Sequence, residues 1–315
     1  MTELIEKVAF GTVDLADMDC PFDHDGPPGR KDSIDNDLVG VGSTLGENME
    51  AGKSSLQYPG AGRAEKIPYP KKKAYPIEIG DWLYPVTCAA HHLIPAQASL
   101  REAKGLLSYM ISKHVAQPLK KKGSRKGKLW SDIGYDVNGA QNGVWLPGNY
   151  AVTGSGGFWE PADSADDDDD EAVAAERRHA ATAAKRQPGS AMLVGALHDV
   201  DDPNNKKYQY VNQATRLFNA QFHDSHGLYS DFVLKALMKI GVAYKSAERR
   251  FIVETACKKC EKRMKGREND GLPPPFGLAR RLNGVSGRLK AYLVGRQGDE
   301  NVYTSRWGKA IAHKT

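Results

Sequence analysis

Two short histidine clusters contain the side chains of this chain that could do chemistry. The first is the adjacent pair His91 and His92, within Cys88-Ala89-Ala90-His91-His92-Leu93-Ile94-Pro95. In an extended segment, neighbouring side chains point to opposite faces, so the two imidazoles cannot serve one metal ion in the same way. One of them could bind a metal while the other transfers a proton, which imidazole does well near neutral pH. An isolated pair of this kind is more often part of an exposed loop, so its interpretation depends on the rest of the chain.

The second cluster is His223 and His226, within Phe222-His223-Asp224-Ser225-His226-Gly227-Leu228-Tyr229. Three residues apart, the two side chains would share one face of a helix. Apolar residues then recur at helical spacing and predict a helix whose buried stripe is Phe232, Val233, Ala236, Leu237 and Ile240. Taken alone, the two histidines fit a metal site and the polar start of a helix equally well.

The elements that would position these clusters can be predicted from turn residues and periodicity. Residues 75–94 indicate short extended pieces that lead into the His-His pair. Asn138-Gly139 and Asn142-Gly143 mark two turns, since both residue types tolerate positive φ. Val144-Trp145-Leu146 then predicts a short buried strand that stops at Pro147. A helix follows the first strand, with its apolar positions at Leu106, Leu107, Met110 and Ile111.

In this order, the motifs resemble the AHH family of the HNH nuclease superfamily. The matching stretches are Ala90 to Pro95, Asn138 to Pro147, and His223 to His226 with Tyr229 and Val233. The resemblance covers about half of the chain. It implies an α+β fold with a ββα-metal core, in which two strands and a helix hold one divalent ion. Residues 150–222 separate the second and third motifs further than in related sequences, and in many relatives the last two histidines are four positions apart rather than three.

The resemblance also implies a role for each polar residue. The metal ligands would be His91, His223 and His226. His92 would be the general base that takes a proton from water, and Asn142 would hold the loop that orients this base, with Asn138 as the alternative. Histidine ligands favour Zn²⁺, Ni²⁺ or Mn²⁺, but an open phosphate-facing position leaves Mg²⁺ possible, so the metal is undecided.

The distribution of charge indicates a polyanionic partner. Residues 1–50 contain twelve acidic and three basic residues, whereas residues 203–315 contain 22 basic and nine acidic ones. A solvated helical surface would give the same imbalance. A basic run interrupted by two glycines is typical of phosphate contacts that do not depend on base sequence. We assign to nucleic-acid binding Lys120, Lys121, Lys122, Arg125, Lys126, Lys128 and, from the third motif, Tyr229.

Composition suggests three consecutive regions. Residues 1–76 form an acidic segment rich in Gly and Pro, expected to be irregular and to serve docking or delivery. Residues 77–240 would be the nuclease core, with a low-complexity insert at about 154–190. Residues 241–315 would be a basic, mostly helical region.

These features predict a nuclease toxin that hydrolyses DNA with little sequence specificity. Members of the resembled family are commonly toxin domains of secreted bacterial effectors, including type VI effectors, and are neutralised by a cognate immunity protein. The expected partners are DNA, such an immunity protein, and a secretion-apparatus or chaperone protein. The chain has no apolar run of roughly 20 residues and no N-terminal signal, so we expect cytoplasmic synthesis without a membrane anchor, followed by delivery into a target cell.

Three other function classes compete with this one. An RNA-cleaving toxin would use the same groups, and a non-catalytic basic nucleic-acid-binding or secretion-adaptor protein with a structural metal would explain the charge but not the ordered motifs. A zinc deaminase is rejected, because it needs His-x-Glu and Pro-Cys-x-x-Cys elements, and Ala256 precedes Cys257-Lys258-Lys259-Cys260 here. A structural zinc at these cysteines would need a second ligand pair, for which Cys20 and His24 are the candidates.

Overall fold

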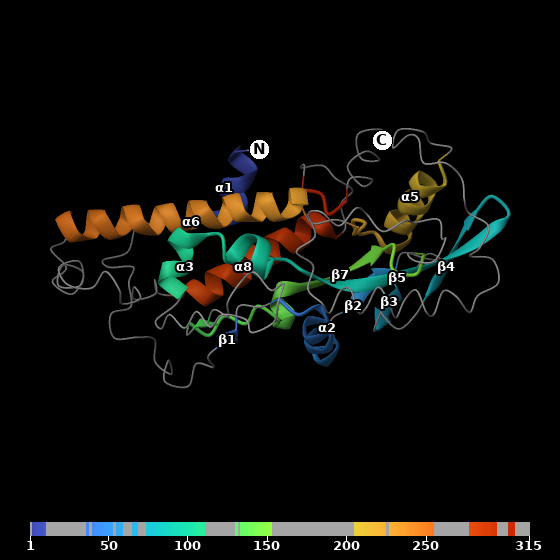
Figure 1. The fold of residues 1–315 in the computed structure, drawn as a ribbon, viewed down its shortest axis with the longest axis horizontal. Coiled ribbons are helices and arrows are strands. Elements are labelled where there is room, and N and C mark those ends of the chain that lie inside the picture. The colour runs from blue at the N-terminus through green and yellow to red at the C-terminus, as the bar shows by residue number, and fades with distance from the viewer. Residues whose placement is uncertain are drawn as a thin grey trace, which may run out of the picture. The chain divides into compact units, whose positions relative to one another are not determined.

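The structure is a computed structural model that describes residues 2–10, 36–37, 40–52, 55–58, 65–68, 74–110, 130–131, 133–152, 205–224, 227–254, 277–294 and 302–305. Within these residues the protein is a mixed helix and strand, α+β structure with a small three-stranded antiparallel sheet (Figure 1). In the same part of the chain, no helix is both long enough and apolar enough to cross a membrane.

The three-stranded sheet has the order β4-β5-β7, with β4 at Tyr75–Ile79, β5 at Trp82–His92 and β7 at Gly143–Gly148. A tight turn joins β4 to β5, and Gly80 adopts the positive φ of +59° that this turn requires. Burial alternates from Tyr84 to Cys88, as expected for a strand with one face on the core, and then changes to Ala89 and His91 on the opposite face. The predicted extended segment that leads into the His-His pair is therefore one long strand.

β7 confirms the predicted buried strand but extends past Pro147. Every residue of β7 is buried. Proline is tolerated here because β7 lies at the edge of the sheet, where a missing N–H breaks no central ladder. The carbonyl oxygen of Pro147 accepts a hydrogen bond of 2.8 Å from the backbone N–H of His223. The end of β7 thus fixes the backbone of a residue 76 positions away.

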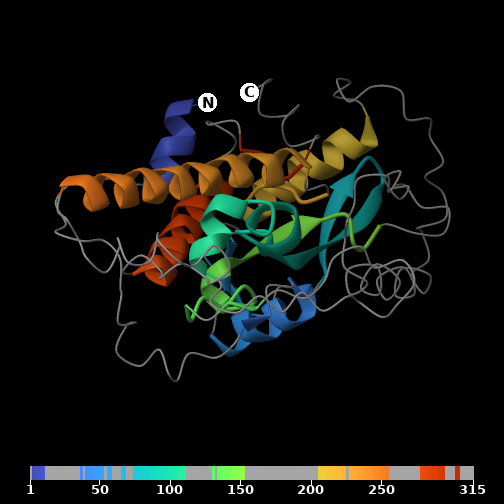
Figure 2. The same cartoon turned by 60° about the vertical axis from the view of Figure 1, so that its left-hand side comes forward.

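The N-terminal region contains helices where the composition predicts irregular structure. α2 (Gly42–Ala51) buries Leu45 and Met49 and packs against β5 and β7 (Figure 2). Gly143 makes this packing close, because a Cβ there would lie 2.3 Å from Met49 Sδ. The high Gly, Pro and Asp content of this region predicts irregular structure. Leu45 and Met49 are nevertheless four residues apart, so they lie on one face of a helix and can be buried together.

Contacts divide the chain into two compact units, each built from separate segments. One consists of Met1–Gly40, Ile94–Val137 and Ser230–Arg288, and the other of Val41–Leu93, Asn138–Tyr229 and Leu289–Thr315. This division cuts across the predicted regions 1–76, 77–240 and 241–315, because segments distant in the sequence pack together. The predicted insert at about 154–190 lies outside the described residues.

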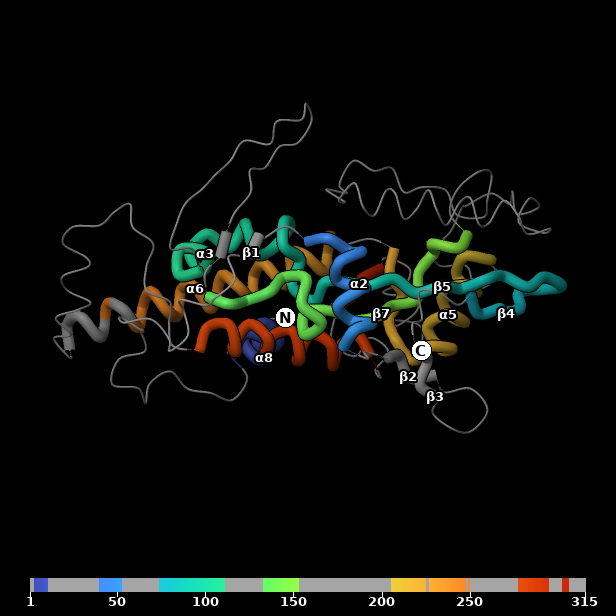
Figure 3. Tube along the Cα trace, turned by 90° about the horizontal axis from the view of Figure 1, so that it is seen from below, coloured from blue at the N-terminus to red at the C-terminus, as the bar shows by residue number. Residues whose placement is uncertain are grey.

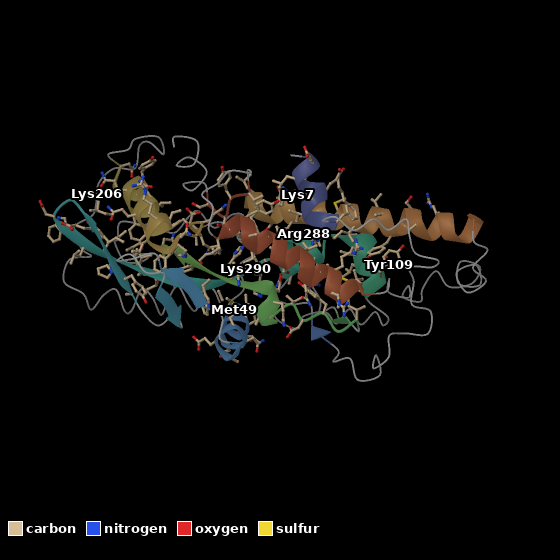
Figure 4. The ribbon with its side chains drawn as sticks, turned by 180° about the vertical axis from the view of Figure 1, so that it is seen from behind. Lys7, Met49, Tyr109, Lys206, Arg288 and Lys290 are labelled. Atoms are coloured by element: carbon tan, nitrogen blue, oxygen red, sulfur yellow. The ribbon has the colours of Figure 1, made fainter. Side chains whose placement is uncertain are left out.

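The first unit is mainly helical. Its elements are α1 (Thr2–Phe10), the π-helix η4 (Ala96–Leu100), α3 (Lys104–Met110), most of α6 (Gly227–Glu254), the first part of α8 (Leu278–Leu293), and the short strand pair β1 (Asn36–Asp37) and β6 (Trp130–Ser131). The predicted apolar stripe of α6 is confirmed, since all five of its residues are buried. The guanidinium of Arg288 donates to the carbonyl oxygens of Val8 and Ala9 at 2.8 and 3.3 Å, which caps the C-terminus of α1 (Figure 4).

A glycine allows α6 and α3 to approach closely in this unit. A Cβ on Gly241 would lie 2.7 Å from the backbone nitrogen of Leu106, an atom that no side-chain rotation can move. We therefore expect Gly241→Ala to lower the free energy of unfolding by about 1–3 kcal/mol. The control is Gly287→Ala in α8, where a Cβ would meet nothing within 4 Å, so the free energy of unfolding should rise by about 0.5–1 kcal/mol. Urea denaturation of both variants checks this, and equal effects would contradict the close helix contact.

The second unit holds the sheet, α2, α5 (Lys206–Phe218) and the hairpin of β2 (Ser55–Tyr58) and β3 (Glu65–Pro68). α5 packs against β4 and β7 (Figure 3). The Asn205 side chain caps its N-terminus by accepting from the backbone N–H of Lys207 at 2.8 Å. The hydroxyl of Tyr210 donates to the carbonyl oxygen of Pro85 at 2.8 Å, which ties the helix to β5.

Candidate active site

The last two residues of β5 place adjacent imidazoles in different surroundings. The side chain of His91 is only 2% exposed, whereas that of His92, on the opposite face of the strand, is partly exposed. This separation is the one predicted from an extended backbone. His91 can therefore interact with the interior of the unit, while solvent can reach His92.

His91 lies against His223, which comes 132 positions later in the chain. The two rings meet edge to face with their centroids 4.7 Å apart, and His223 is also buried. An isolated bridge to Gly148 and the hydrogen bond to Pro147 hold the backbone of His223 beside the end of β7. The structure thus brings together two of the three predicted metal ligands.

The spacing of these two rings fits a shared metal ion. With metal–nitrogen bonds of about 2.0–2.1 Å and angles of roughly 90–110°, two imidazoles on one ion have centroids about 4.5–5.2 Å apart. The observed separation of 4.7 Å falls in this range, which ordinary edge-to-face packing of two rings also gives. The third predicted ligand, His226, lies outside the described residues. Among the residues that are described, no group of three His, Cys, Asp or Glu side chains could hold a metal ion.

Tyr229 also packs against His91. Its ring packs edge to face on His91 with centroids 4.9 Å apart, and its hydroxyl donates to the carbonyl oxygen of Leu93 at 2.7 Å. The side chain has no exposed surface. This position corrects the predicted nucleic-acid contact of Tyr229, because a fully buried ring cannot touch a nucleic acid and instead keeps His91 in place.

Asn138 is the residue that contacts His92. The Nε2 atom of His92 lies 3.0 Å from Asn138 Oδ1. The same oxygen accepts a hydrogen bond of 2.8 Å from the backbone N–H of Val41. Because a backbone N–H can only donate, the Asn138 amide must point its oxygen toward both groups. His92 Nε2 must then carry the hydrogen and donate it, which leaves the lone pair of the neutral ring on Nδ1.

Asn142, the first choice for the orienting role, contacts the end of β5 through its backbone. It is fully buried at the end of the 3-10 helix η5 (Ala140–Asn142), and its carbonyl oxygen accepts from the backbone N–H of Leu93 at 2.8 Å. Asn142 therefore joins the turn before β7 to the residue that follows β5. The alternative, Asn138, is the direct partner of the predicted base. Both occur in Asn-Gly pairs, so the sequence alone could not separate them.

Two residues that support His223 carry no recognisable signal in the sequence. Tyr150 is buried, its hydroxyl forms a hydrogen bond with His223 Nδ1, and the two rings stack with centroids 5.8 Å apart. Gln221, also buried, donates from Nε2 to the carbonyl oxygen of Val302 at 2.6 Å and accepts at Oε1 from the backbone N–H of Thr304 at 3.2 Å. The segment 302–305 therefore holds the loop that presents His223.

Most of the remaining predicted residues cannot be placed relative to this cluster, because they lie outside the described part of the chain. The basic run assigned to phosphate contacts lies outside the described residues, as do Cys20, His24, Cys257 and Cys260. Cys88 is described and buried in the middle of β5, and burial raises the pKa of its thiol well above the ordinary value. A neutral, buried thiol is part of the core and not a nucleophile.

Comparison with protein-family models, characterised proteins and solved structures gave no match. The functional interpretation therefore depends on the geometry of His91, His92, Asn138 and His223.

Proposed function

We propose that this protein is a metal-dependent nuclease that hydrolyses phosphodiester bonds of DNA. Its core would be of the ββα-metal type, made of β5, β7 and the start of α6. One observation carries the proposal: His91 is buried beside His223, while the next residue, His92, is accessible to solvent and bonded to Asn138. Hydrolysis of a phosphodiester needs both a metal ion at the phosphate and a group that takes a proton from water.

In this proposal, one histidine transfers a proton and the other three bind the metal ion. His92 Nδ1 would accept a proton from the attacking water, while the bond from Nε2 to Asn138 keeps the ring oriented and stabilises the imidazolium that forms. His91 and His223, completed by His226, would hold one divalent ion. When bound, such an ion supplies charge stabilisation at the phosphate and at the leaving oxygen. The imidazole ligands favour Zn²⁺, Ni²⁺ or Mn²⁺, and Mg²⁺ stays open.

The wider biological role follows from the sequence resemblance. We propose an antibacterial effector that is made in the cytoplasm, delivered into a competitor and neutralised by an immunity protein. Low sequence specificity would follow from contacts to phosphates by the basic run of residues 120–128. RNA is the alternative substrate of the same site, because attack on phosphorus needs the same groups.

Incubation of the purified full chain with a plasmid and a divalent ion tests the proposal. We expect the plasmid to be degraded with Zn²⁺, Ni²⁺, Mn²⁺ or Mg²⁺, to survive in excess EDTA, and to be degraded again when the ion is restored. A parallel reaction with single-stranded RNA identifies the preferred substrate. An intact plasmid of lower mobility on a gel, with or without metal, would contradict the nuclease and favour a non-catalytic nucleic-acid-binding protein.

A further inference from the structure

We propose that Tyr150 is a positioning residue that fixes the ring tautomer of His223, so that His223 presents Nε2 to the metal ion. The inference deepens the proposed function and rests on its metal site. It concerns a tyrosine outside the three sequence motifs, two residues after the end of β7.

The contact between Tyr150 and His223 is specific to one nitrogen. The Tyr150 hydroxyl is hydrogen-bonded to His223 Nδ1, and the tyrosine ring lies nearly parallel to the imidazole, at 20° with centroids 5.8 Å apart. The side chains are 7% and 6% exposed. Solvent therefore has little access to the Nδ1 side of the ring, and the hydroxyl sets the hydrogen-bonding there.

This hydrogen bond occupies Nδ1 of His223, so Nε2 is the ring nitrogen that a metal could bind. A neutral imidazole has one N–H and one lone pair, whereas a phenolic hydroxyl can either donate or accept. When Nδ1 carries the hydrogen and donates it to the tyrosine oxygen, the lone pair is on Nε2. A partner of this kind orients a metal-bound histidine and raises its basicity, and its loss typically weakens metal binding about 10–100-fold.

The fold holds the two side chains together through the end of β7. Gly148 forms a parallel bridge with His223, so the backbone of the strand runs directly beside this ligand. A Cβ on Gly148 would lie 2.3 Å from Tyr150 Cε2 and 2.8 Å from the carbonyl oxygen of His223. Only glycine leaves room for this arrangement. The tyrosine is thus placed by the same strand end that fixes the His223 backbone.

Tyr229 does not act in the same way on the other ligand. Its ring packs on His91, but its hydroxyl donates to the Leu93 carbonyl and not to an imidazole nitrogen. Of the two tyrosines described at the site, Tyr150 is therefore the one whose hydroxyl forms a hydrogen bond with a ring nitrogen of a proposed metal ligand.

The test compares Tyr150→Phe with Tyr109→Phe in the full chain. Tyr109 is a buried tyrosine of the other unit, with its ring against Tyr244, and serves as the matched control. Calorimetric titration with Zn²⁺ should show a Kd increased about 10–100-fold in Tyr150→Phe and unchanged in Tyr109→Phe. In the metal-free wild type, long-range ¹H–¹⁵N spectra should show the hydrogen on Nδ1 of His223.

The inference would be overturned by a wild-type Kd for Zn²⁺ in a folded Tyr150→Phe protein. A hydrogen on Nε2 of His223 in the metal-free wild type would overturn it as well. A phenolate-to-metal absorption band in the Cu²⁺-loaded wild type that disappears in Tyr150→Phe would also overturn it, because Tyr150 would then be a ligand itself.

The plasmid assay separates this inference from the proposed function. Weakened metal binding in Tyr150→Phe, together with an intact plasmid in every wild-type reaction, would support the positioning role and reject the nuclease. Plasmid cleavage by the wild type, together with an unchanged Kd for Zn²⁺ in Tyr150→Phe, would reject the positioning role alone. A wild-type protein that binds no divalent ion would overturn both.

Discussion

Replacement of His92 by alanine is expected to lower the rate of DNA cleavage about 10²–10⁴-fold, the usual contribution of a general base. The fold and the affinity for Zn²⁺ should stay near wild type, since His92 is partly exposed at the end of β5 and points away from the His91–His223 pair. The rate of plasmid nicking at saturating metal measures the first effect. Thermal unfolding and calorimetric titration measure the others.

His91→Ala is the matched comparison, because it removes the neighbouring histidine from the other face of the same strand. This ring is buried and contacts both His223 and Tyr229, so its loss should weaken Zn²⁺ binding as well as cleavage. The role of His92 would be rejected by a folded His92→Ala protein with full activity. A His92→Ala protein that loses metal as completely as His91→Ala would place both imidazoles at the ion.

The second large effect is expected at Gln221. This residue neither binds the metal nor transfers a proton, but it lies two positions before His223 in the same loop. Its side-chain amide serves three groups: Nε2 donates to the carbonyl oxygens of Val302 and Tyr292, and Oε1 accepts from the N–H of Thr304. Gln221→Ala would leave these buried groups without their partner. We expect the free energy of unfolding to fall by about 2–4 kcal/mol, given about 1–3 kcal/mol for each unsatisfied buried group.

Gln221→Ala should also weaken Zn²⁺ binding, because the segment 302–305 no longer fixes the loop that carries His223. Gln213→Ala is the control: this glutamine donates to the carbonyl oxygen of Glu78 at an exposed position, so its loss should change stability by no more than about 0.5 kcal/mol. Urea denaturation and Zn²⁺ titration of both variants provide the measurements. Equal stability of the two variants would show that the C-terminal segment does not support the site.

Local patterns of the sequence predicted several elements correctly. The apolar stripe of α6 and the buried strand at 144–146 follow from spacing within one element, which the backbone geometry of a helix or a strand dictates. α2 was not predicted, because two apolar residues in a Gly-rich and acidic stretch give no clear period. Its burial depends on β5 and β7, which are distant in the sequence.

The choice between Asn138 and Asn142 also depended on tertiary structure. Both residues precede a glycine, and each lies near the start of the same strand. The pairing of β5 with β7 places Gly143 opposite His92, so Asn142 meets the backbone of Leu93. Asn138 reaches the ring of His92 because Val41, at the start of α2, fixes its amide.

The sequence by itself determined that His91 and His92 face opposite ways, because successive side chains of any extended strand alternate. It could not determine what each imidazole would meet. His91 meets His223 and Tyr150 reaches His223 Nδ1 only because the end of β7 and the segment 302–305 hold the loop of residues 219–224. These contacts join parts of the chain that lie about 70 to 130 residues apart, and such packing has no local period in the sequence from which it can be read.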